Sequence, residues 1–387
     1  MKILITSDLF TVTTNGVVTS LRNLWNEMKA RGHEVKILTF SENKKSYKDE
    51  AEGVYYIGST SLEWIYPGVR KPKTFRGSLV EELIEWKPDI IHSQCEFFSY
   101  FFALRIAKKT GAKLVHTYHT MYEDYVGYVF KFSKKFGRFA VRKFSRNRLD
   151  KADWVVAPTK KVSDLLERYK VKSPVSVIPT GISLEQHRQR ITPEQRQQKR
   201  LELGFKENDV VMMTLGRLGH EKNVDEVIKY FADTKKKHQN LKFLIVGDGP
   251  ARDKLTSLTE NLGLTGEIVF TGKVLPSEVQ NYYQLGDLFV SASTSETQGL
   301  TYIEAAANAL PLLCRADPCL DEVIEQGENG YAYTEEEEFL KFLDDIAGDA
   351  EWRKSASEKS NEISKKFDKS VFGDSVEEIY NELLKNK

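Results

Sequence analysis

Two carboxylates, Glu296 and Glu304, are the side chains of this sequence whose surroundings suggest chemistry most directly. They lie eight positions apart, between an apolar run at 288–290 and an alanine-rich segment at 302–309. This pattern predicts a buried strand, a loop and a helix, with Glu296 in the loop and Glu304 in the helix. Both carboxylates can accept hydrogen bonds from hydroxyl groups, such as those of a sugar.

The beginning of that helix is expected to bind an anion. The first backbone amides of a helix have no intrahelical acceptor, and the helix dipole favours negative charge beside them. The amides concerned belong to Gly299, Leu300 and Thr301. A phosphate site flanked by two carboxylates suits a sugar nucleotide, although an acidic capping loop on a surface helix would give the same pattern.

A second turn carries two cations that could hold a diphosphate. Arg217 and Lys222 lie five positions apart, directly after an apolar run at 210–215 that predicts another strand. Arginine can bind phosphate oxygens in a bidentate manner, and lysine acts as a point charge. An ordinary exposed turn could have the same composition.

The first half of the chain offers one glycine and two histidines as candidates. Gly16 precedes a predicted helix at 19–31 and would let the backbone approach a ligand closely. The turn lacks the GxGxxG pattern, which argues against a nicotinamide cofactor. His116 lies within a predicted strand and is interpreted as structural. His119 follows that strand, where the ligand cleft is expected, and is interpreted as functional.

Neither a metal site nor a membrane-spanning segment is expected. The sequence has no HExxH motif, no Cys/His cluster and no Asp-x-Asp pair. Its three cysteines form no CxxC motif, which favours a reducing, cytoplasmic compartment. No apolar run reaches the roughly 18 residues that span a bilayer. The sequence therefore predicts a protein that is soluble or lies on a membrane surface.

The elements that must position these residues follow a regular alternation of strand and helix patterns. Such alternation predicts parallel sheets covered by helices on both faces. The expected strands are 2–7, 34–39, 90–93, 113–117, 154–158 and 175–178, followed by 210–215, 242–246, 267–271, 288–291 and 312–314. Ligands of such sheets bind beyond the carboxyl ends of the strands, where the candidate residues lie.

Two doubly wound units facing a common cleft are expected, because the pattern restarts near 179–182. The predicted domains are residues 1–180 and residues 181–366. The tail at 367–387 has apolar residues at helical spacing and predicts an amphipathic helix that must dock elsewhere.

Charge is distributed unevenly along the chain, although the net charge is only +1. Residues 1–180 hold 31 Lys or Arg against 19 Asp or Glu, and the remainder holds 26 against 37. A basic first half suits an anionic surface. A chance distribution of surface charge is the alternative.

The segment 131–151 concentrates this charge, with nine Lys or Arg, one Asp and four phenylalanines. We expect a helix with aromatic residues on one face and cations on the other, suited to an anionic membrane. The residues assigned to the membrane surface are Lys131, Phe132, Lys134, Lys135, Phe136, Arg138, Arg142 and Lys143. Alternatively, the Phe residues pack on their own domain. No motif for nucleic-acid binding accompanies the charge, so nucleic acid is not an expected partner.

Three motifs together resemble family 4 glycosyltransferases, and the likeness extends over essentially the whole chain. They are Gly216–Asn223, the Glu296-x7-Glu304 element and Ile178–Ile182. The resemblance implies an α/β GT-B fold with two Rossmann-like domains, in which the last helix crosses back to the first domain. It implies that residues 1–180 form an acceptor-side or membrane-facing domain and that residues 181–366 bind the nucleotide sugar. It also implies retaining, metal-independent transfer of a hexose from a UDP-sugar, without a cofactor.

The resemblance also implies roles for particular residues. Arg217 and Lys222 would hold the diphosphate and ease its departure, Glu304 would bind the ribose, and Glu296 would face the donor sugar. Three further contacts follow: Gly16 near the phosphate or sugar, His119 near the reacting centre, and Lys273 with Val274 beside the base. The segment Asn308–Pro311 departs from the family, because many members have Gly in place of Ala309.

A narrower likeness concerns the segment Thr117–Tyr125 and the basic aromatic stretch, which are similar to bacterial 1,2-diacylglycerol 3-glucosyltransferases. It implies a peripheral enzyme on the inner face of the cell membrane that glucosylates diacylglycerol from UDP-glucose, giving an α-glycosyl lipid. UDP-galactose or another donor, and a glycolipid or polysaccharide acceptor, remain alternatives. A sugar-nucleotide-binding protein without turnover is the non-enzymatic alternative. The oligomeric state stays open.

Overall fold

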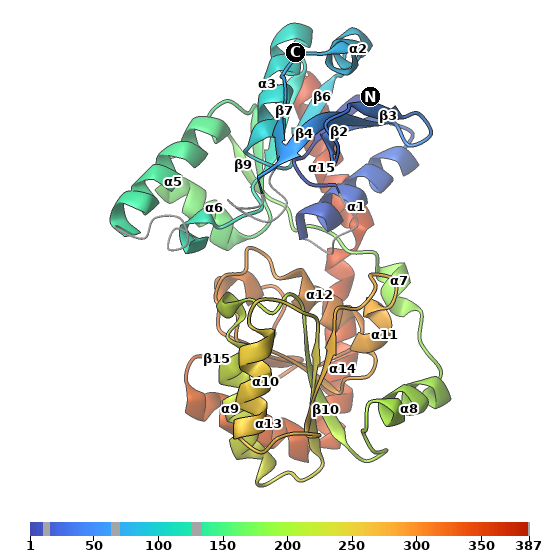
Figure 1. Ribbon diagram of the computed structural model, residues 1–387, viewed down its shortest axis with the longest axis vertical. Helices are drawn as coiled ribbons and strands as arrows, with labels where there is room; N and C mark the ends of the chain where they lie inside the picture. Colours follow the sequence, from blue (N-terminus) through green and yellow to red (C-terminus); the bar gives the residue numbers. More distant parts are fainter. Residues whose placement is uncertain (11–15, 63–69, 126–133, 386–387) are drawn as a thin grey trace. The chain divides into compact units, whose positions relative to one another are not determined.

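The computed structural model of the protein describes residues 1–10, 16–62, 70–125 and 134–385 (Figure 1). The chain forms two compact units. Unit 1 comprises Met1–Ile182 and Lys369–Lys387, and unit 2 comprises Ser183–Asp368. The unit limits lie two residues beyond the expected domain limits at 180 and 366. Each unit is a doubly wound α/β domain, as predicted.

The sheet of unit 1 has the strand order β3-β4-β2-β1-β6-β7-β8-β9, and β5 pairs with β4. Neighbouring strands are parallel except β3 and β5, which run antiparallel to β4. The strands are β1 (Lys2–Thr6), β2 (Glu34–Ser41), β3 (Tyr47–Asp49), β4 (Val54–Ser61), β5 (Arg70–Pro72), β6 (Ile90–Ser93), β7 (Lys113–Thr117), β8 (Trp154–Ala157) and β9 (Val175–Val177).

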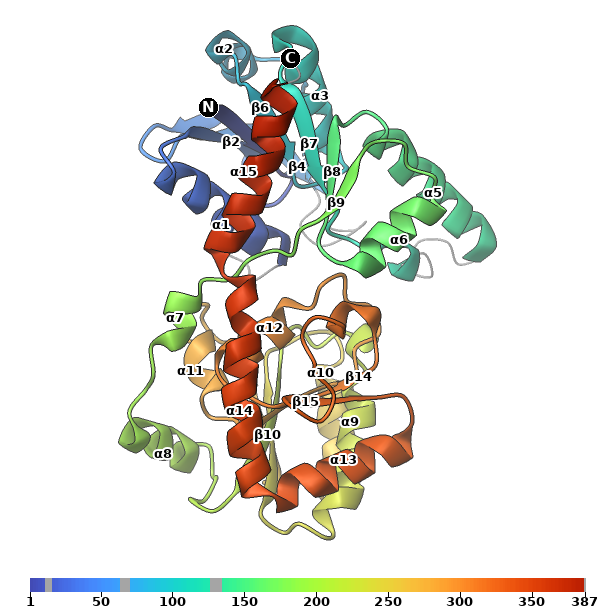
Figure 2. The ribbon, with the colours of Figure 1, turned by 180° about the vertical axis from the view of Figure 1, so that it is seen from behind.

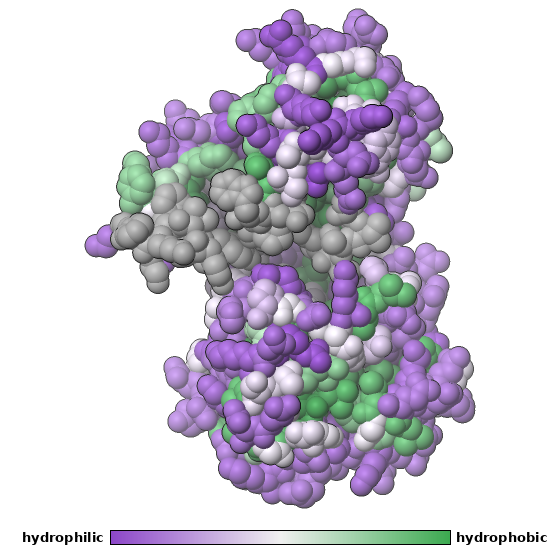
Figure 3. Space-filling model, in the orientation of Figure 1, coloured by the Kyte–Doolittle hydropathy of each residue, from purple (hydrophilic) through white to green (hydrophobic). Residues whose placement is uncertain are grey.

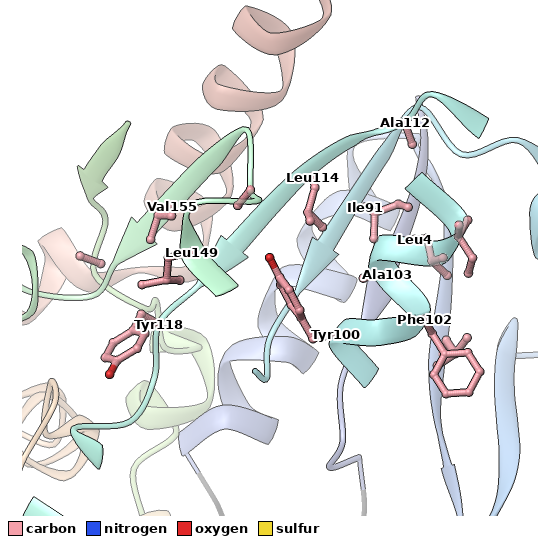
Figure 4. Close-up of a cluster of buried hydrophobic side chains, with 14 of the residues drawn as sticks. Leu4, Ile91, Tyr100, Phe102, Ala103, Ala112, Leu114, Tyr118, Leu149 and Val155 are labelled. Atoms are coloured by element: carbon pink, nitrogen blue, oxygen red, sulfur yellow. The ribbon is translucent and has the colours of Figure 1, made fainter. Parts of the chain in front are cut away.

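Each face of this sheet carries its own hydrophobic core, because successive side chains of a strand point to opposite faces. In β1, Leu4 joins one core, and Ile3 and Ile5 join the other. Figure 4 shows the Leu4 core, where Tyr100 and Phe102 of α3 lie among strand residues. The helices between strands of unit 1 are α1 (Gly16–Ala30), α2 (Ser78–Trp86), α3 (Phe98–Thr110), η1 (Tyr122–Tyr125), α5 (Lys134–Leu149) and α6 (Lys160–Arg168).

The tail forms α15 (Lys369–Lys385), which runs beside α1 on unit 1 (Figure 2). Val376 and Tyr380 are fully buried against the Ile3 and Ile5 core. Near the amino-terminal end of α15, Asp374 pairs with Arg31 at 2.6 Å. The expected crossing of the last helix to the first domain is therefore confirmed.

Unit 2 has a parallel sheet of order β12-β11-β10-β13-β14-β15. Its strands are β10 (Val210–Leu215), β11 (Leu241–Val246), β12 (Ile268–Gly272), β13 (Leu288–Ser291), β14 (Leu312–Arg315) and β15 (Gly330–Tyr333). Its helices are α7 (Leu184–Arg188), α8 (Pro193–Glu202), α9 (Val224–Lys235), α10 (Arg252–Asn261), α11 (Val279–Tyr283), α12 (Leu300–Ala307), α13 (Glu336–Gly348) and α14 (Ala350–Ser364). Ala309 precedes β14 with φ 59°, the left-handed region that favours glycine.

Candidate active site

The turn between β10 and α9 positions the two predicted cations of unit 2. Gly216 has φ 149°, which a residue with a side chain rarely adopts. The Arg217 guanidinium donates to Oε1 of Glu221 at 2.7 Å, and the Arg217 side chain is 52% exposed. The Lys222 ammonium pairs with the Glu296 carboxylate, 74 residues along the chain. Lys222 and Glu296 therefore lie together at the carboxyl edge of this sheet.

A glycine turn after β11 supports the cation turn. A Cβ atom on Gly247 would lie 1.9 Å from the carbonyl oxygen of Gly216, and one on Gly249 would lie 2.6 Å from that of Leu218. The Leu218 amide donates to the carbonyl oxygen of Asp248 at 2.9 Å. This pair, a Gly-x-Gly after an apolar run, favours a strand-end turn, and it does follow β11 directly. Its role is close backbone packing.

The loop after β13 leads into α12 through a glycine that two independent constraints require. Gly299 caps the helix with φ 72°. A Cβ atom there would lie 2.4 Å from the buried Tyr302 ring, whose hydroxyl lies 3.2 Å from Oγ of Ser291. The amides of Leu300 and Thr301 fall in the first turn, where they lack an intrahelical acceptor. The helix start therefore presents the predicted donors at the same edge of the sheet as Lys222.

Glu304 lies in α12, and its side chain is held by α11. The Tyr283 hydroxyl donates to Oε2 of Glu304 at 2.8 Å. Burial raises the pKa of Glu304 to about 7, and the hydrogen bond from Tyr283 opposes this rise. Glu304 is therefore a half-buried carboxyl that changes charge near neutral pH. Sequence reasoning did not reveal Tyr283, which is 21 residues away in the sequence.

Lys273 and Val274 follow β12 at this edge of unit 2. Lys273 is exposed and Val274 is half-buried. Gly272, immediately before them, accepts a hydrogen bond from the Gly247 amide at 3.1 Å, which connects this segment to the glycine turn. Their expected contact with a nucleotide base remains a prediction.

In unit 1, the predicted residues Gly16 and His119 lie at the start of α1 and just beyond β7. Nε2 of His119 lies 2.7 Å from Oε1 of Gln94, which follows β6. Burial lowers the pKa of His119 to about 4, so its imidazole is neutral at physiological pH. His116, interpreted as structural, is fully buried, and its Nε2 lies 3.2 Å from Oε1 of Glu96.

Sequence reasoning missed three polar residues at this edge of unit 1: Asp8, Gln94 and Glu96. All three are buried. Asp8 accepts hydrogen bonds from the amide and hydroxyl of Ser99 at 3.0 and 3.1 Å, and burial raises the pKa of Asp8 to about 7. Glu96 also accepts a hydrogen bond from the Tyr122 hydroxyl. The available signal was position, since Asp8 and Gln94 follow directly after predicted strands and Glu96 lies two residues beyond Gln94.

The basic segment forms α5, whose sequence KKFGRFAVRKFSRNRL contains seven cations and no acidic residue. The expectation that its aromatic residues share one face is wrong. Phe136 and Phe139 are 63% and 62% exposed, whereas Phe144 packs against Phe97 at a ring distance of 5.8 Å. Phe144 differs from Phe136 and Phe139 because it lies on the side of the helix that faces inward, where Ser145 is buried.

The outward surface of α5 therefore mixes aromatic and cationic side chains. Figure 3 shows hydrophobic atoms at the surface over α5, next to hydrophilic ones. The exposed cations are Lys135, Arg138, Arg142 and Lys143. The predicted residues Lys131 and Phe132 lie outside the described residues, and the side chain of Lys134 is likewise not described.

Two features of the described parts of the chain bear on cofactor and membrane chemistry. In these ranges, no three side chains of His, Cys, Asp or Glu come together as metal ligands. None of the helices in the same ranges is long and apolar enough to cross a bilayer.

Comparison with known proteins identifies the family. Residues 14–186 match Glycosyltransferase Family 4, and residues 195–363 match Glycosyl transferases group 1. An α-monoglucosyldiacylglycerol synthase of Acholeplasma laidlawii is 33% identical over 99% of this chain and 98% of its own length. Another, from Streptococcus pneumoniae, is 34% identical over 98% of this chain and 85% of its own length.

Solved structures show the same fold. The crystal structure of HepE from Anabaena in complex with UDP covers 99% of this chain and 100% of its own, with a TM-score of 0.76 at 17% identity. WaaG, a glycosyltransferase involved in lipopolysaccharide biosynthesis, gives a TM-score of 0.73 at 17% identity, covering 98% of this chain and 99% of its own. These likenesses establish the GT-B fold. The chain belongs to the family 4 glycosyltransferases and is an enzyme of that family.

Proposed function

We propose that the protein is a retaining glucosyltransferase that moves glucose from UDP-glucose to 1,2-diacylglycerol at a membrane surface, giving an α-glucosyl lipid. The observation that carries the proposal is the similarity to two α-monoglucosyldiacylglycerol synthases, at 33% and 34% identity over nearly the whole chain. A plant relative named sulfoquinovosyl transferase, 27% identical over 92% of this chain, is a reason to test other donor sugars.

The donor would bind at the carboxyl edge of unit 2. Arg217 and Lys222 carry the positive charge there, and both pair with carboxylates that a diphosphate could replace. The α12 backbone amides, which carry no charge, would donate further hydrogen bonds to the phosphate oxygens. Glu304 would accept a hydrogen bond from a ribose hydroxyl. Glu296 would face the donor sugar once the diphosphate has replaced it at Lys222. UDP in the HepE complex supports a uridine nucleotide as the donor class.

Catalysis would rest on charge stabilisation and positioning. As the bond between the anomeric carbon and the diphosphate oxygen breaks, negative charge develops on the leaving group, where Arg217 and Lys222 can stabilise it. The acceptor hydroxyl would attack from the same face and pass its proton to the departing oxygen, which preserves the α configuration. Because two cations could supply this stabilisation, the proposed reaction needs no metal ion.

Membrane attachment would use α5. Each cation near an anionic lipid surface contributes about 1 kcal/mol, so the exposed cations together would give salt-sensitive binding. Phe136 and Phe139, exposed among these cations, could insert between lipid headgroups.

The test of the acceptor and donor is a transfer assay on vesicles. Vesicles containing diacylglycerol, with or without anionic lipid, are supplied with UDP-glucose or UDP-galactose, and the product's anomeric configuration is determined. We expect α-glucosyl diacylglycerol, formed faster on anionic vesicles and unchanged by EDTA. A β-linked product would refute retention, and loss of activity in EDTA would refute metal independence. Transfer only to a glycolipid or polysaccharide would refute the diacylglycerol acceptor.

The membrane part has its own matched control. Replacing Arg138, Arg142 and Lys143 by Gln should release the protein from anionic vesicles in a sedimentation assay while UDP affinity stays the same. Replacing three other exposed cations of unit 1, Lys108, Lys109 and Lys172, removes equal charge and should change vesicle binding much less. Equal losses in the two variants would mean that net charge, rather than α5, binds the membrane.

A further inference from the structure

Gln94 is a buried amide that touches a residue proposed for the reacting centre. It is 2% exposed, and its backbone amide donates to the carbonyl oxygen of Thr6 at 2.8 Å. It follows β6, which lies between β1 and β7 in the sheet. The backbone of Gln94 is therefore fixed at the carboxyl edge of unit 1, and its side chain reaches His119.

The contact between the two side chains determines which imidazole nitrogen carries the proton. Oε1 of Gln94 lies 2.7 Å from Nε2 of His119, and an amide oxygen can only accept a hydrogen bond. Nε2 must then carry the hydrogen, and in a neutral imidazole Nδ1 becomes the acceptor. Among the described residues, none makes a hydrogen bond to Nδ1. The Nε2 atom of Gln94 is also buried without a partner among them.

We propose that Gln94 is a positioning residue that fixes His119 as the neutral, Nε2-protonated imidazole, so that Nδ1 can accept a hydrogen bond from a substrate hydroxyl. In this amide orientation, Nε2 of Gln94 is a second polar atom that could donate a hydrogen bond to the same kind of ligand, a polyol. This inference rests on the proposed function, because it assumes that His119 touches the sugar or the acceptor.

The charged groups around His119 do not raise its pKa enough to protonate the imidazole at neutral pH. Burial lowers the pKa of His119 to about 4, Glu96 raises the pKa, and His116 lowers it. His92, a third histidine of this edge, is fully buried and hydrogen-bonded to Thr117 and Tyr380. The Glu96 carboxylate is occupied by His116 and Tyr122.

The test compares Gln94→Leu and Gln94→Glu with the full-length wild-type enzyme. Leu removes the acceptor, so kcat should fall about ten- to a hundred-fold while KM for UDP-glucose stays within about three-fold. A carboxylate at this position would stabilise the imidazolium, so the acidic limb of the pH-rate profile of Gln94→Glu should move up by about one to two pH units. Activity of this variant should recover at alkaline pH.

Asn43→Asp is the matched control, because it makes the same amide-to-carboxylate change on an exposed residue of unit 1. It should leave the pH profile unchanged. UDP affinity and the unfolding temperature of each variant report whether it folds. Wild-type kcat in Gln94→Leu, or an unshifted profile in Gln94→Glu, would overturn the inference.

Imidazole ¹⁵N chemical shifts give a readout that does not depend on the acceptor. At pH 5 the wild-type protein should show His119 mostly neutral and protonated on Nε2, and Gln94→Glu should show it at least half charged. A proton on Nδ1 in the wild type would mean that the amide is turned the other way and would overturn the inference. If no sugar reaches diacylglycerol but the shifts are as expected, only the proposed acceptor fails.

Discussion

At the scale of single residues, Glu304 is the group whose charge should affect donor binding near neutral pH. Burial raises the pKa of Glu304 to about 7, so its ionised fraction rises as the pH passes through 7. Only the ionised form offers both oxygens as acceptors to ribose hydroxyls. UDP affinity should therefore increase up to about tenfold between pH 6 and pH 8, as measured by isothermal titration calorimetry.

The control for this prediction is Glu304→Gln, which keeps the shape but does not titrate. UDP itself loses a proton and gains negative charge at about pH 6. The pH dependence of UDP affinity in Glu304→Gln reports that contribution alone. Tyr283→Phe provides an independent check. It removes the hydrogen bond that lowers the pKa of Glu304, so the rise in affinity should move to higher pH. Identical pH dependence in wild type and Glu304→Gln would contradict the assignment.

Lys222 should matter more to the transition state than to donor binding. Its ammonium pairs with Glu296 in this structure and would transfer to the departing diphosphate. Lys222→Gln should lower kcat/KM by roughly a hundred- to a thousand-fold, similar to the loss of one oxyanion donor. The matched control is Lys229→Gln on the exposed surface of α9, which should stay near wild type. Equal activities of the Lys222→Gln and Lys229→Gln variants would show that Lys222 takes no part in catalysis.

The sequence predicted which residue types lie at the strand ends better than it predicted their contacts. Arg217, Lys222, Glu296 and Glu304 follow or approach strand ends that an apolar pattern reveals, so their common edge could be inferred. The pairing of Lys222 with Glu296 depends on β10 lying beside β13, a sheet order that periodicity does not specify. The same holds for Gln94 and His119, which meet because β6 and β7 are neighbours.

At the scale of elements, the start of α12 depends on Gly299. Gly299→Ala would place a methyl group 2.4 Å from the Tyr302 ring in a backbone conformation that alanine disfavours. Unfolding free energy should fall by about 1–3 kcal/mol, and UDP affinity should also fall because the helix start must shift. Chemical denaturation and calorimetry measure the two effects.

Gly263→Ala separates backbone strain from the clash. Gly263 has φ 68°, yet a Cβ atom there would meet nothing within 4 Å. This control should lose stability only through the backbone, by about 1–2 kcal/mol, and keep UDP affinity. Similar UDP affinities in the two variants would show that the α12 terminus does not hold the donor.

Among the described elements, most strands were predictable from an apolar run, including the edge strands β9 and β12, and four strands were not. β3, β4, β5 and β15 are absent from the sequence-based expectation. β4 ends in the polar stretch Ser59–Ser61, and β15 begins at a glycine, so neither shows the continuous apolar run of a strand buried on both faces. The expectation for the phenylalanines of α5 failed for a related reason, because composition does not give the angle of each residue around a helix.

At the scale of the whole molecule, the two units differ in how the chain builds them. Unit 2 is one continuous segment, whereas unit 1 needs its first 182 residues together with the tail from Lys369. The tail contributes five buried apolar side chains to the unit 1 core: Phe372, Val376, Ile379, Tyr380 and Leu383. The buried Tyr380 hydroxyl also lies 2.5 Å from Nδ1 of His92, within the sheet of unit 1.

This difference predicts which part of the chain folds alone. Each large apolar side chain contributes about 1.5–3 kcal/mol when buried. Losing five of them would cost about 7.5–15 kcal/mol, which is comparable with the roughly 5–15 kcal/mol that stabilises most domains. Residues 1–182 without the tail should therefore fail to unfold cooperatively on heating, whereas residues 183–368 should unfold cooperatively. Because Arg217, Lys222 and the α12 amides lie in unit 2, the fragment 183–368 should bind UDP with nearly the affinity of the full chain. A folded 183–368 fragment with no affinity for UDP would show that the donor site needs unit 1.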